Sequence, residues 1–370
     1  MLKAYKYELI PNEEQKHQLN GAFGSCRMVY NLALETKNTA YQKGVNLTCF
    51  DLIKQLPELK ETFDWLKETP SQSLQQSISN LDNAFTNFFK GRASFPKFKK
   101  KDAHQSFRIP IAVKVDFEAW TVQLPKYGKV KFHNSRTFEG LVKQATVSKS
   151  TTGRYFISIL VDNKRELPSK KPILGSTTIG IDLGIKHFAI LSNGVKINNN
   201  KFLIQSLKDL RREQRSLSRK KKGSNRRLLQ KQKVAKLHEK VTNQRKDFLH
   251  KLSTQIVNEY DSIAIENLNV SGMIKNHKLA KHIADASWGT FEIMLKYKAE
   301  WKGKNILQIG RFEPSSKICS CGKINNELKL SQRTWTCKHC NTTHDRDVLA
   351  ANNIKKFGLG QNQANAKVVQ

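Results

Sequence analysis

Asp182 lies inside an apolar run, and its surroundings point to chemistry. The run covers residues 179–185, with Gly180 and Gly184 two positions before and after the acid. A charged side chain inside a buried strand is costly unless it is paired or binds a metal ion. The glycines keep bulk away, so that a large group can approach the backbone. We therefore predict that Asp182 is a ligand of a divalent-metal site; the alternative is an acid that caps a turn at the strand end.

Two further carboxylates have related surroundings. Glu266 closes a second short apolar run, and Asp347 stands where a final helical pattern begins. Two acids on strands, followed by one at the start of a helix, within a mixed α/β core predict that the three carboxylates converge at one sheet edge. Converging carboxylates need cations, and two divalent ions about 3.5–4 Å apart suit phosphodiester hydrolysis. Mg²⁺ fits, because it binds few carboxylates together with waters and substrate phosphates. Each acid alone could instead be a cap or a turn residue.

Four cysteines form a second chemical pattern. Cys319 and Cys321 make one knuckle, and Cys337 and Cys340 make another. Four thiolates would close a tetrahedral structural Zn²⁺ site. The first knuckle is C-x-C rather than the usual C-x-x-C, so one thiol could fail to reach the ion. His339 or His344 could then replace it, and a zinc-free reduced loop is the remaining alternative.

The charge balance points to a polyanionic partner. The 370-residue chain has 65 Lys and Arg against 31 Asp and Glu, a formal net charge of +34. Such an excess opposes folding through self-repulsion, so its use is to meet an opposite charge. A membrane surface is the rival partner, but no apolar run approaches the ~18 residues of a membrane span. With no signal peptide at its start, we expect a cytoplasmic, nucleoid-associated protein that binds nucleic acid in a salt-sensitive way.

Two basic segments are the expected nucleic-acid contacts. Residues 95–101 interleave aromatic side chains with lysines, which suits base stacking and phosphate contact together. Residues 203–252 carry many cations on two expected long helices separated by a turn at residues 223–225. A solvated loop is the alternative for the first segment, and a solvated charged face is the alternative for the second. The predicted contacts are Lys97, Lys99, Lys100, Arg211, Arg212, Arg215, Arg219, Lys220, Arg226 and Arg227.

The remaining elements frame these sites. Residues 4–10 alternate as a half-buried strand, residues 12–91 have helical periodicity, and residues 107–162 are β-rich with turns at 127–128 and 152–153. This pattern predicts a small antiparallel barrel or sheet with a helical bundle inserted after its first strand. An interaction bundle without further chemistry is the plainer interpretation of the helices. The tail from residue 358 to 370 is expected to be frayed.

Several motifs together resemble the TnpB family, whose members are RuvC-like proteins encoded by small insertion sequences and related to compact type V CRISPR effectors. The resemblance runs along nearly the whole chain and includes the opening strand and residues 95–99. The motifs that carry it are Gly180-Ile-Asp-Leu-Gly-Ile-Lys186, Ile265-Glu-Asn-Leu268, Arg311-Phe-Glu-Pro-Ser-Ser-Lys317, the paired cysteines and Asp345-Arg-Asp-Val-Leu-Ala-Ala351.

The resemblance implies a multidomain fold: an α/β, RNase H-like RuvC core, an N-terminal β-barrel with an inserted helical bundle, and a zinc ribbon. The expected domains are a wedge-like β-barrel at 1–11 and 92–170, a helical recognition insert at 12–91, a RuvC-like nuclease at 171–310 and 345–357 with a basic helical hairpin at about 203–252, a zinc ribbon at 311–344 and a flexible tail at 358–370.

The resemblance also implies an RNA-guided, Mg²⁺-dependent DNA endonuclease of a transposable element. Its partners would be a transposon-derived guide RNA, double-stranded DNA and a displaced single strand, with the protein as a monomer. The family's catalytic acids map to Asp182, Glu266 and Asp347, and Asp347 is preferred to Asp345 because it stands closer to the Ala-Ala segment. One departure is Leu349, at a position where the family usually has Asn.

Three other functions are compatible with parts of this pattern. The chain could be an RNA-guided DNA binder that represses without cutting, and the intact acid trio argues against this. It could be a transposase that joins strands without a guide RNA. It could also be a zinc-ribbon RNA-binding scaffold whose acids only cap helices and turns.

Overall fold

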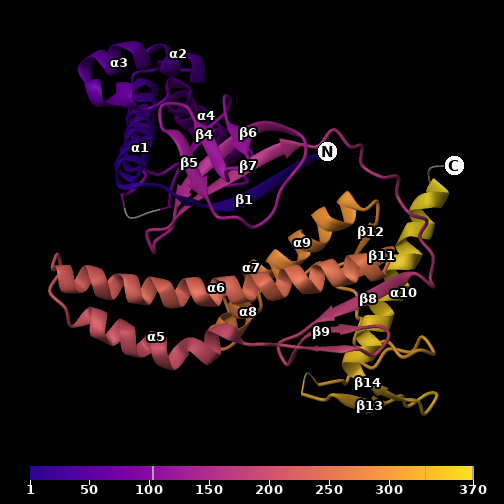
Figure 1. The fold of residues 1–370 in the computed structure, drawn as a ribbon. Helices are drawn as coiled ribbons and strands as arrows, with labels where there is room; N and C mark the ends of the chain where they lie inside the picture. The colour runs from indigo at the N-terminus through magenta and orange to yellow at the C-terminus, as the bar shows by residue number, and fades with distance from the viewer. Residues whose placement is uncertain (102–103, 330, 369–370) are drawn as a thin grey trace. The chain divides into compact units, whose positions relative to one another are not determined.

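The chain folds into two compact units, Met1–Glu166 and Leu167–Gln370, in a computed structural model (Figure 1). The structure describes residues 1–101, 104–329 and 331–368, with side chains described as far as residue 360. None of the described helices is long and apolar enough to cross a membrane.

The N-terminal unit contains a seven-stranded sheet in the order β2-β6-β7-β1-β5-β4-β3. Its strands are β1 (Leu2–Ile10), β2 (Gln105–Ile109), β3 (Lys114–Asp116), β4 (Thr121–Leu124), β5 (Gly128–Phe132), β6 (Leu141–Lys149) and β7 (Tyr155–Asp162). Neighbouring strands are antiparallel. Buried and half-buried residues alternate along β7, as expected for a strand with one face on the core.

The sheet is open, and the closed β-barrel that the sequence predicted is wrong. In the strand order, β2 and β3 lie at opposite ends and do not pair with each other. Helices α1 (Glu13–Gln42) and α4 (Ser71–Phe89) instead contact β2. An edge strand can be protected by a covering helix as well as by closure of the sheet.

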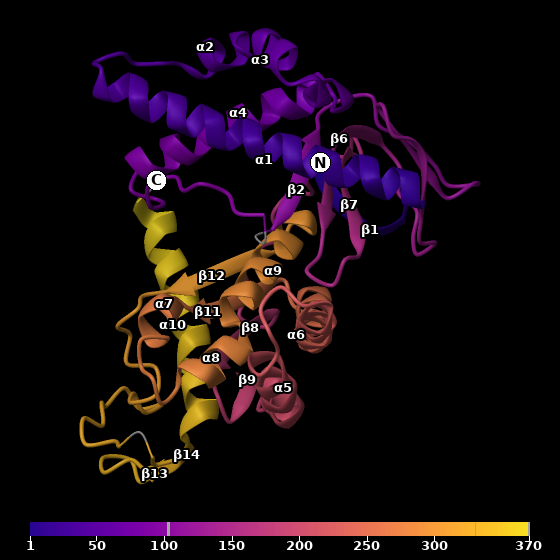
Figure 2. The ribbon, with the colours of Figure 1, turned by 90° about the vertical axis from the view of Figure 1, so that its left-hand side faces the viewer.

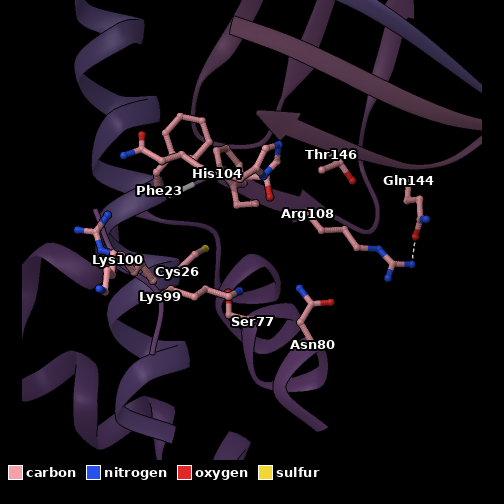
Figure 3. Close-up of a pocket in the computed structure, with 14 residues that line it drawn as sticks. Phe23, Cys26, Ser77, Asn80, Lys99, Lys100, His104, Arg108, Gln144 and Thr146 are labelled. Carbon is pink, nitrogen blue, oxygen red and sulfur yellow. Dashed lines mark hydrogen bonds between the residues drawn. The ribbon is translucent and has the colours of Figure 1, made fainter. Parts of the chain in front are cut away.

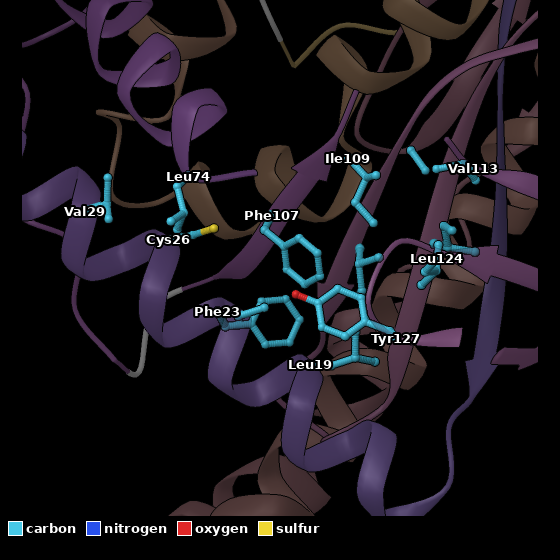
Figure 4. Packing of buried hydrophobic residues seen from close by; sticks show 14 of the residues in the cluster. Leu19, Phe23, Cys26, Val29, Leu74, Phe107, Ile109, Val113, Leu124 and Tyr127 are labelled. Carbon is cyan, nitrogen blue, oxygen red and sulfur yellow. The ribbon is translucent and has the colours of Figure 1, made fainter. Parts of the chain in front are cut away.

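The helices of this unit share one hydrophobic core with the sheet. Asn12 and Gln15 form a capping box that starts α1. Figure 4 shows Phe23 of α1 beside Phe107 of β2, and the two ring centroids lie 5.3 Å apart. The shorter helices are α2 (Cys49–Lys54), α3 (Leu56–Thr62) and the 3₁₀ helix η1 (Asp64–Glu68). The helical insert therefore packs against the sheet.

The C-terminal unit contains a mixed five-stranded sheet in the order β10-β9-β8-β11-β12. The strands are β8 (Thr178–Leu183), β9 (His187–Leu191), β10 (Lys196–Asn198), β11 (Ser262–Glu266) and β12 (Asn305–Ile309). β8, β11 and β12 are parallel, whereas β9 is antiparallel to both of its neighbours. The mixed α/β core predicted around the acids is confirmed.

Helices cover both faces of this sheet (Figure 2). Ile181 and Ile265 pack in one cluster with residues of α6 (Asn225–Glu259) and α9 (Trp288–Trp301). Ala264, on the opposite face of β11, packs with Ile354 of α10 (Arg346–Val368). Successive side chains on a strand point to opposite faces, so the even-numbered residues of β8 and β11 face α10. The remaining elements are α5 (Phe202–Ser218), α7 (Val270–Met273), α8 (Ala280–Ala286), β13 (Thr334–Thr336) and β14 (Thr343–Asp345).

The two long basic helices predicted from sequence are confirmed as α5 and α6, with Gly223 in the turn between them at a φ of +84°. Helix α10 continues through Val368, over residues where the sequence predicted a frayed tail, and the flexibility of this tail stays a prediction. A Cβ at Gly358 would lie 3.0 Å from the Ala264 Cβ, so this part of the helix still packs on the sheet. Residues 369–370 lie outside the described residues.

Candidate active site and cysteine cluster

Asp182 and Glu266 lie at the same level on neighbouring strands. Ile181 and Ile265 are partners in the parallel ladder between β8 and β11, and each acid follows directly. Both acids share the strand face that carries Gly180 and Ala264, which is the face covered by α10. The sheet therefore directs two carboxylates toward the helix that carries the third.

Gly180 allows α10 to approach β8 closely. A Cβ at this position would lie 2.0 Å from the Ala351 carbonyl oxygen and 2.8 Å from the Lys355 backbone nitrogen. The large group that the glycine admits is therefore the backbone of α10. Because Asp347 lies one turn before Ala351 on this helix, the close contact sets the distance between Asp347 and Asp182.

Asp345 and Asp347 have different roles at the start of α10. One Asp345 carboxylate oxygen accepts the backbone N–H groups of Asp347 and Val348 at 3.0 and 3.2 Å, as a helix cap does. The other oxygen of Asp345 pairs with Lys196 of β10. The side chain of Asp347 is left to face Arg333 and Arg346, with N–O distances of 3.1 Å to each.

The ionisation of Asp182 responds to its burial and to the other two acids. Burial is the largest cause that raises the pKa of this carboxyl, followed by the charges of Glu266 and Asp347, to about 7. The positive charges of Arg346 and Arg333 act in the opposite direction on this pKa. Three segments that are distant along the chain thus carry acids whose charges act on Asp182, and a metal site shared by all three stays a prediction.

A serine and an asparagine hold Glu266 in place. The Ser315 hydroxyl donates a hydrogen bond of 2.7 Å to the Glu266 carboxylate. The side chain of Asn353 on α10, which is only 2% exposed, donates to the backbone carbonyls of Ser315 and Ile318 at 2.7 Å each. Glu266 is thereby connected to the same helix that carries Asp347.

The donor set suits a hard divalent cation. All three groups offer carboxylate oxygens, the ligands that Mg²⁺ prefers. Burial chiefly, and then the negative charges of Glu266 and Asp347, raise the pKa of Asp182, and a bound cation would offset both effects. The Asp347 carboxylate contacts the two arginines, and among the described residues only the four cysteines form a group whose ligand atoms all lie within 4.8 Å. Ion binding would therefore require Asp347 to turn from its arginines toward the other acids.

The four predicted cysteines gather in one cluster. The sulfurs of Cys319 and Cys340 lie 3.5 Å apart and those of Cys321 and Cys337 lie 3.8 Å apart. These separations fit four ligands of one ion, since Zn–S bonds of about 2.3 Å at tetrahedral angles place sulfurs about 3.8 Å apart. The short C-x-C knuckle therefore reaches the cluster with both thiols. The Thr342 hydroxyl, 3.3 Å from the Cys340 sulfur, helps to lower the pKa of that thiol to about 6.

The surroundings of the cluster answer two questions raised by the sequence. His344 does not replace a cysteine; its Nε2 atom lies 3.0 Å from the Cys319 sulfur, and the residue is only 9% exposed. His339 is exposed. Leu349 of α10 packs in one buried group with Cys319, Trp335 and Cys337. The departure from the family's Asn thus gives an apolar contact between the cysteine cluster and the helix of Asp347.

The predicted nucleic-acid contacts do not all have the same surroundings. The larger group of these side chains is exposed: Lys97, Lys99, Lys100, Arg211, Arg212, Arg215, Arg219 and Arg226. Lys220 is half-buried. Arg227 donates hydrogen bonds to the carbonyls of Leu217 and Lys220, and so closes the C-terminal end of α5. Leu228, near the tip of the hairpin, is 56% exposed.

Three residues at the site were missed from sequence: Arg333, Ser315 and Asn353. Arg333 lies two positions before Trp335, and its carbonyl accepts the N–H of Arg346, which extends the β13–β14 hairpin beside Asp347. Ser315 belongs to a motif that sequence reasoning singled out without giving it a role. Asn353 had no such signal, because a polar residue in a helix gives no indication of what it faces.

Comparisons with known families and proteins agree with this architecture. A family described as "Probable transposase" matches residues 158–277, a "Cas12f1-like, TNB domain" matches residues 288–354, and a "Helix-turn-helix domain" matches residues 1–45, which form β1 and α1 here. A protein of Streptomyces pristinaespiralis named "Putative RNA-guided DNA endonuclease" is 36% identical, covering 96% of this chain and 89% of its own length. "Putative RNA-guided DNA endonuclease InsQ" of Escherichia coli K12 is 35% identical, covering 96% of this chain and 92% of its own length.

A solved structure shows the same fold at much lower identity. The Cas12f1 protein in a cryo-EM complex with sgRNA and target DNA aligns with a TM-score of 0.58 and 16% identity, covering 93% of this chain and 83% of that one. The family matches and the full-length relatives define a transposon-encoded protein of the kind related to Cas12f1. The chain belongs to the TnpB family.

Proposed function

We propose that this protein is an RNA-guided DNA endonuclease whose catalytic residues are Asp182, Glu266 and Asp347. The observation that carries the proposal is that Asp182 and Glu266 stand at the same level on β8 and β11, on the face covered by α10, with the pKa of Asp182 raised to about 7 by burial and then by the charges of Glu266 and Asp347. The two relatives at 35–36% identity bear names that state such an activity and align with 96% of this chain. On this proposal, the five-stranded sheet and its helices are the RNase H-like RuvC core.

The residues of the site have separable roles in phosphodiester hydrolysis. Bound Mg²⁺ would supply water activation and stabilise the leaving oxygen. Asp182, Glu266 and Asp347 would hold the ions, and the Ser315 hydroxyl orients Glu266 through its 2.7 Å hydrogen bond. Arg333 faces Asp347 at 3.1 Å, so its guanidinium is placed to meet a substrate phosphate once Asp347 turns to metal.

The cysteine cluster would be a structural Zn²⁺ site that positions this arginine. The β13–β14 hairpin carries the second cysteine knuckle in its loop, with Arg333 immediately before β13 and Asp345 at the end of β14. Four coordinated thiolates would fix the hairpin, because closed tetrahedral zinc sites contribute directly to local folding. Zinc would thus act on catalysis through Arg333 and through the packing of Leu349.

The substrate strand would pass a solvent-facing aromatic ring. Phe312 is 92% exposed on the loop whose Ser315 holds Glu266. A bare ring beside a nuclease site offers a stacking surface to an unpaired base, an interaction of about 1–3 kcal/mol. The exposed cations of α5 and α6 would contact phosphates of the same nucleic acid.

Specificity would come chiefly from base pairing with a guide RNA, and the protein would read backbone shape and a short adjacent motif. The net charge of +34 suits a chain that holds both RNA and DNA. The names of the relatives and the sgRNA–target DNA complex of the Cas12f1 neighbour support these partners. The N-terminal sheet with its helical insert would hold guide and heteroduplex.

The decisive experiment identifies the guide and then tests cutting. The protein is expressed together with the flanking DNA of its own element, and the RNA that co-purifies is sequenced. A plasmid library with the matching target and randomised flanks is then incubated with the complex, with and without Mg²⁺. We expect Mg²⁺-dependent double-strand cuts beside one short motif, and none with Asp182→Ala.

Each alternative predicts a different product. Wild-type protein that binds the target but leaves it intact would make this chain a guided repressor. Joined DNA strands formed in the absence of RNA would make it a transposase that acts directly. Asp182→Ala should still bind the target, since the acid is proposed to act in cutting and not in recognition.

A further inference from the structure

The N-terminal unit contains a cationic cavity that the proposed cleavage chemistry does not use. It has a volume of about 320 Å³ and lies between α1, α4, β2 and β6 (Figure 3). Its polar side chains include Ser77 and Asn80 from α4 and Gln144 and Thr146 from β6. The buried rings of Phe23 and Phe107 contribute to its wall.

The charge of the cavity has one sign. Arg27, Lys99, Lys100 and Arg108 all line it, together with His104, and none of the described lining residues is Asp or Glu. Like charges gathered around one space repel one another, so the arrangement is stabilised when an anion enters. A phosphate group is the anion that a nucleic-acid-binding protein would bring there.

The cationic side chains are held in place by the fold. The Asn31 side chain accepts the Lys99 N–H at 2.8 Å and donates to the Lys99 carbonyl at 3.0 Å, which fixes this loop to α1. The Lys99 ammonium lies 3.8 Å from the centre of the Tyr30 ring. Arg108 donates to the Gln144 side chain, and its buried Nε–H has no hydrogen-bond partner among the described residues. A buried donor without a partner is costly, and a ligand oxygen would satisfy it.

We propose that this cavity binds a single unpaired nucleotide of the nucleic acid carried by the protein, with its phosphate on Arg108 and Lys99 and its base edge facing Asn80 and Gln144. This rests on the proposed function only in the identity of the ligand. The volume suits the proposal, since small-molecule pockets begin at about 300 Å³. Amide side chains offer a donor and an acceptor together, which is what distinguishes one base edge from another.

The first test measures nucleotide binding without cleavage. Full-length protein in EDTA is titrated with AMP, dAMP and inorganic phosphate at constant ionic strength, and thermal stability is recorded. We expect AMP or dAMP to raise the melting temperature more than phosphate does, and the difference between the two nucleotides assigns the site to RNA or to DNA. Equal shifts for all three probes would mean a general anion site and would overturn the proposal.

Matched variants locate the effect. Arg108→Gln should weaken nucleotide binding about tenfold or more, because it removes a charge-assisted contact. Lys114→Gln removes an exposed cation on β3, outside the cavity, and should leave binding within twofold of wild type. If Arg108→Gln misfolds, Lys100→Gln, an exposed lining residue, serves in its place. Equal effects of cavity and control variants would refute the assignment.

Cross-linking gives an independent readout in the assembled complex. RNA containing 4-thiouridine, or DNA containing 4-thiothymidine, is bound in EDTA and irradiated, and the attached peptides are identified. Cross-links at one nucleotide position to residues 99–108 or 144–146 support the cavity, and cross-links elsewhere alone contradict it. Because none of these readouts needs strand cutting, an inactive nuclease would not be mistaken for an empty pocket.

Discussion

Asp345 caps the helix on which Asp347 stands: one of its carboxylate oxygens accepts the Asp347 N–H at 3.0 Å. Two acids separated by one residue thus have different roles. The first fixes the start of α10 and pairs with Lys196, and the second pairs with two arginines while its charge helps to raise the pKa of Asp182. This division supports the choice of Asp347 as the proposed third ligand.

A substitution at Asp345 should therefore lower stability, whereas a substitution at Asp347 should abolish cleavage. Asp345→Ala removes the cap and should lower the free energy of unfolding by about 1 kcal/mol, within the usual 0.5–2 kcal/mol range for caps. Asp345→Asn, which retains a capping oxygen, should recover most of this loss. Asp347→Asn should abolish cleavage with little change in stability, as measured by denaturant unfolding and plasmid cutting. Full activity of Asp347→Asn would contradict its role as a ligand.

The raised pKa of Asp182 predicts an unusual stability effect. An acid whose pKa is higher in the folded state binds more protons there, so its contribution to stability falls as pH rises from about 4 to about 7. In EDTA above pH 7, Asp182→Asn should be more stable than wild type, by at most about 4 kcal/mol. Thermal unfolding between pH 4 and pH 8 measures this difference.

Magnesium provides the control for that prediction. Added Mg²⁺ should stabilise the wild type by neutralising the acids, and it should stabilise Asp182→Asn much less. A variant that is no more stable than wild type at pH 8 in EDTA would show that neither burial nor the neighbouring acids penalise the ionised Asp182.

Arg333 should matter for cutting and not for metal content. Arg333→Gln removes the guanidinium that faces Asp347 at 3.1 Å. We expect cleavage to slow about 10²-fold, the scale seen when one preorganised charge donor is lost. Zinc content and target binding should be unchanged, as measured by elemental analysis and gel shift. If cleavage is unaltered, Arg333 pairs with Asp347 only when no metal ion is bound and has no role in cutting.

Zinc removal should act at a distance. Cys321→Ser opens the thiolate cluster, and the protein is expected to retain less than one zinc per chain. We then expect the β13–β14 hairpin and Leu349 to lose order and cleavage to be lost. The thermal unfolding transition of the N-terminal unit should not change. Cys49→Ser is a matched control, since Cys49 lies outside the cluster in the other unit. Zinc retained at full stoichiometry would refute a four-cysteine site.

Gly180→Ala should disturb the site through packing. Its Cβ would meet the Ala351 carbonyl at 2.0 Å, and overpacking of this kind costs about 1–3 kcal/mol or more. Gly289→Ala in α9 is the control, because nothing lies within 4 Å of its added Cβ and alanine favours a helix. Cleavage should fall in the first variant only.

The sequence predicted those features that a local pattern encodes. The basic helices α5 and α6, the strands around Asp182 and Glu266, and the clustering of Cys319 with three other cysteines all follow from periodicity or spacing along short segments. Asp182, Glu266 and Asp347 stand on two strands and at the start of a helix, as the sequence predicted, and the metal site that they would share stays a prediction.

The features that the sequence did not predict depend on contacts between distant segments. The bond from Ser315 to Glu266 and the pairing of Arg333 with Asp347 join residues with no periodic relation. The open edge of the N-terminal sheet depends on α1 and α4 covering β2, and strand patterns alone do not distinguish a covered edge from a closed barrel. The helical continuation after Gly358 likewise depends on its contact with Ala264.

Because Asp347 lies on α10, the third proposed ligand is synthesised after the other two. The ribosome has already produced β8 and β11, with two of the proposed ligands, long before it adds the final helix. A nascent or prematurely terminated polypeptide that ends before residue 346 lacks both the third acid and the helix that packs on Gly180. On the proposed assignment, such fragments cannot nick the genome of the cell, so translation itself delays the hazard until α10 has been synthesised.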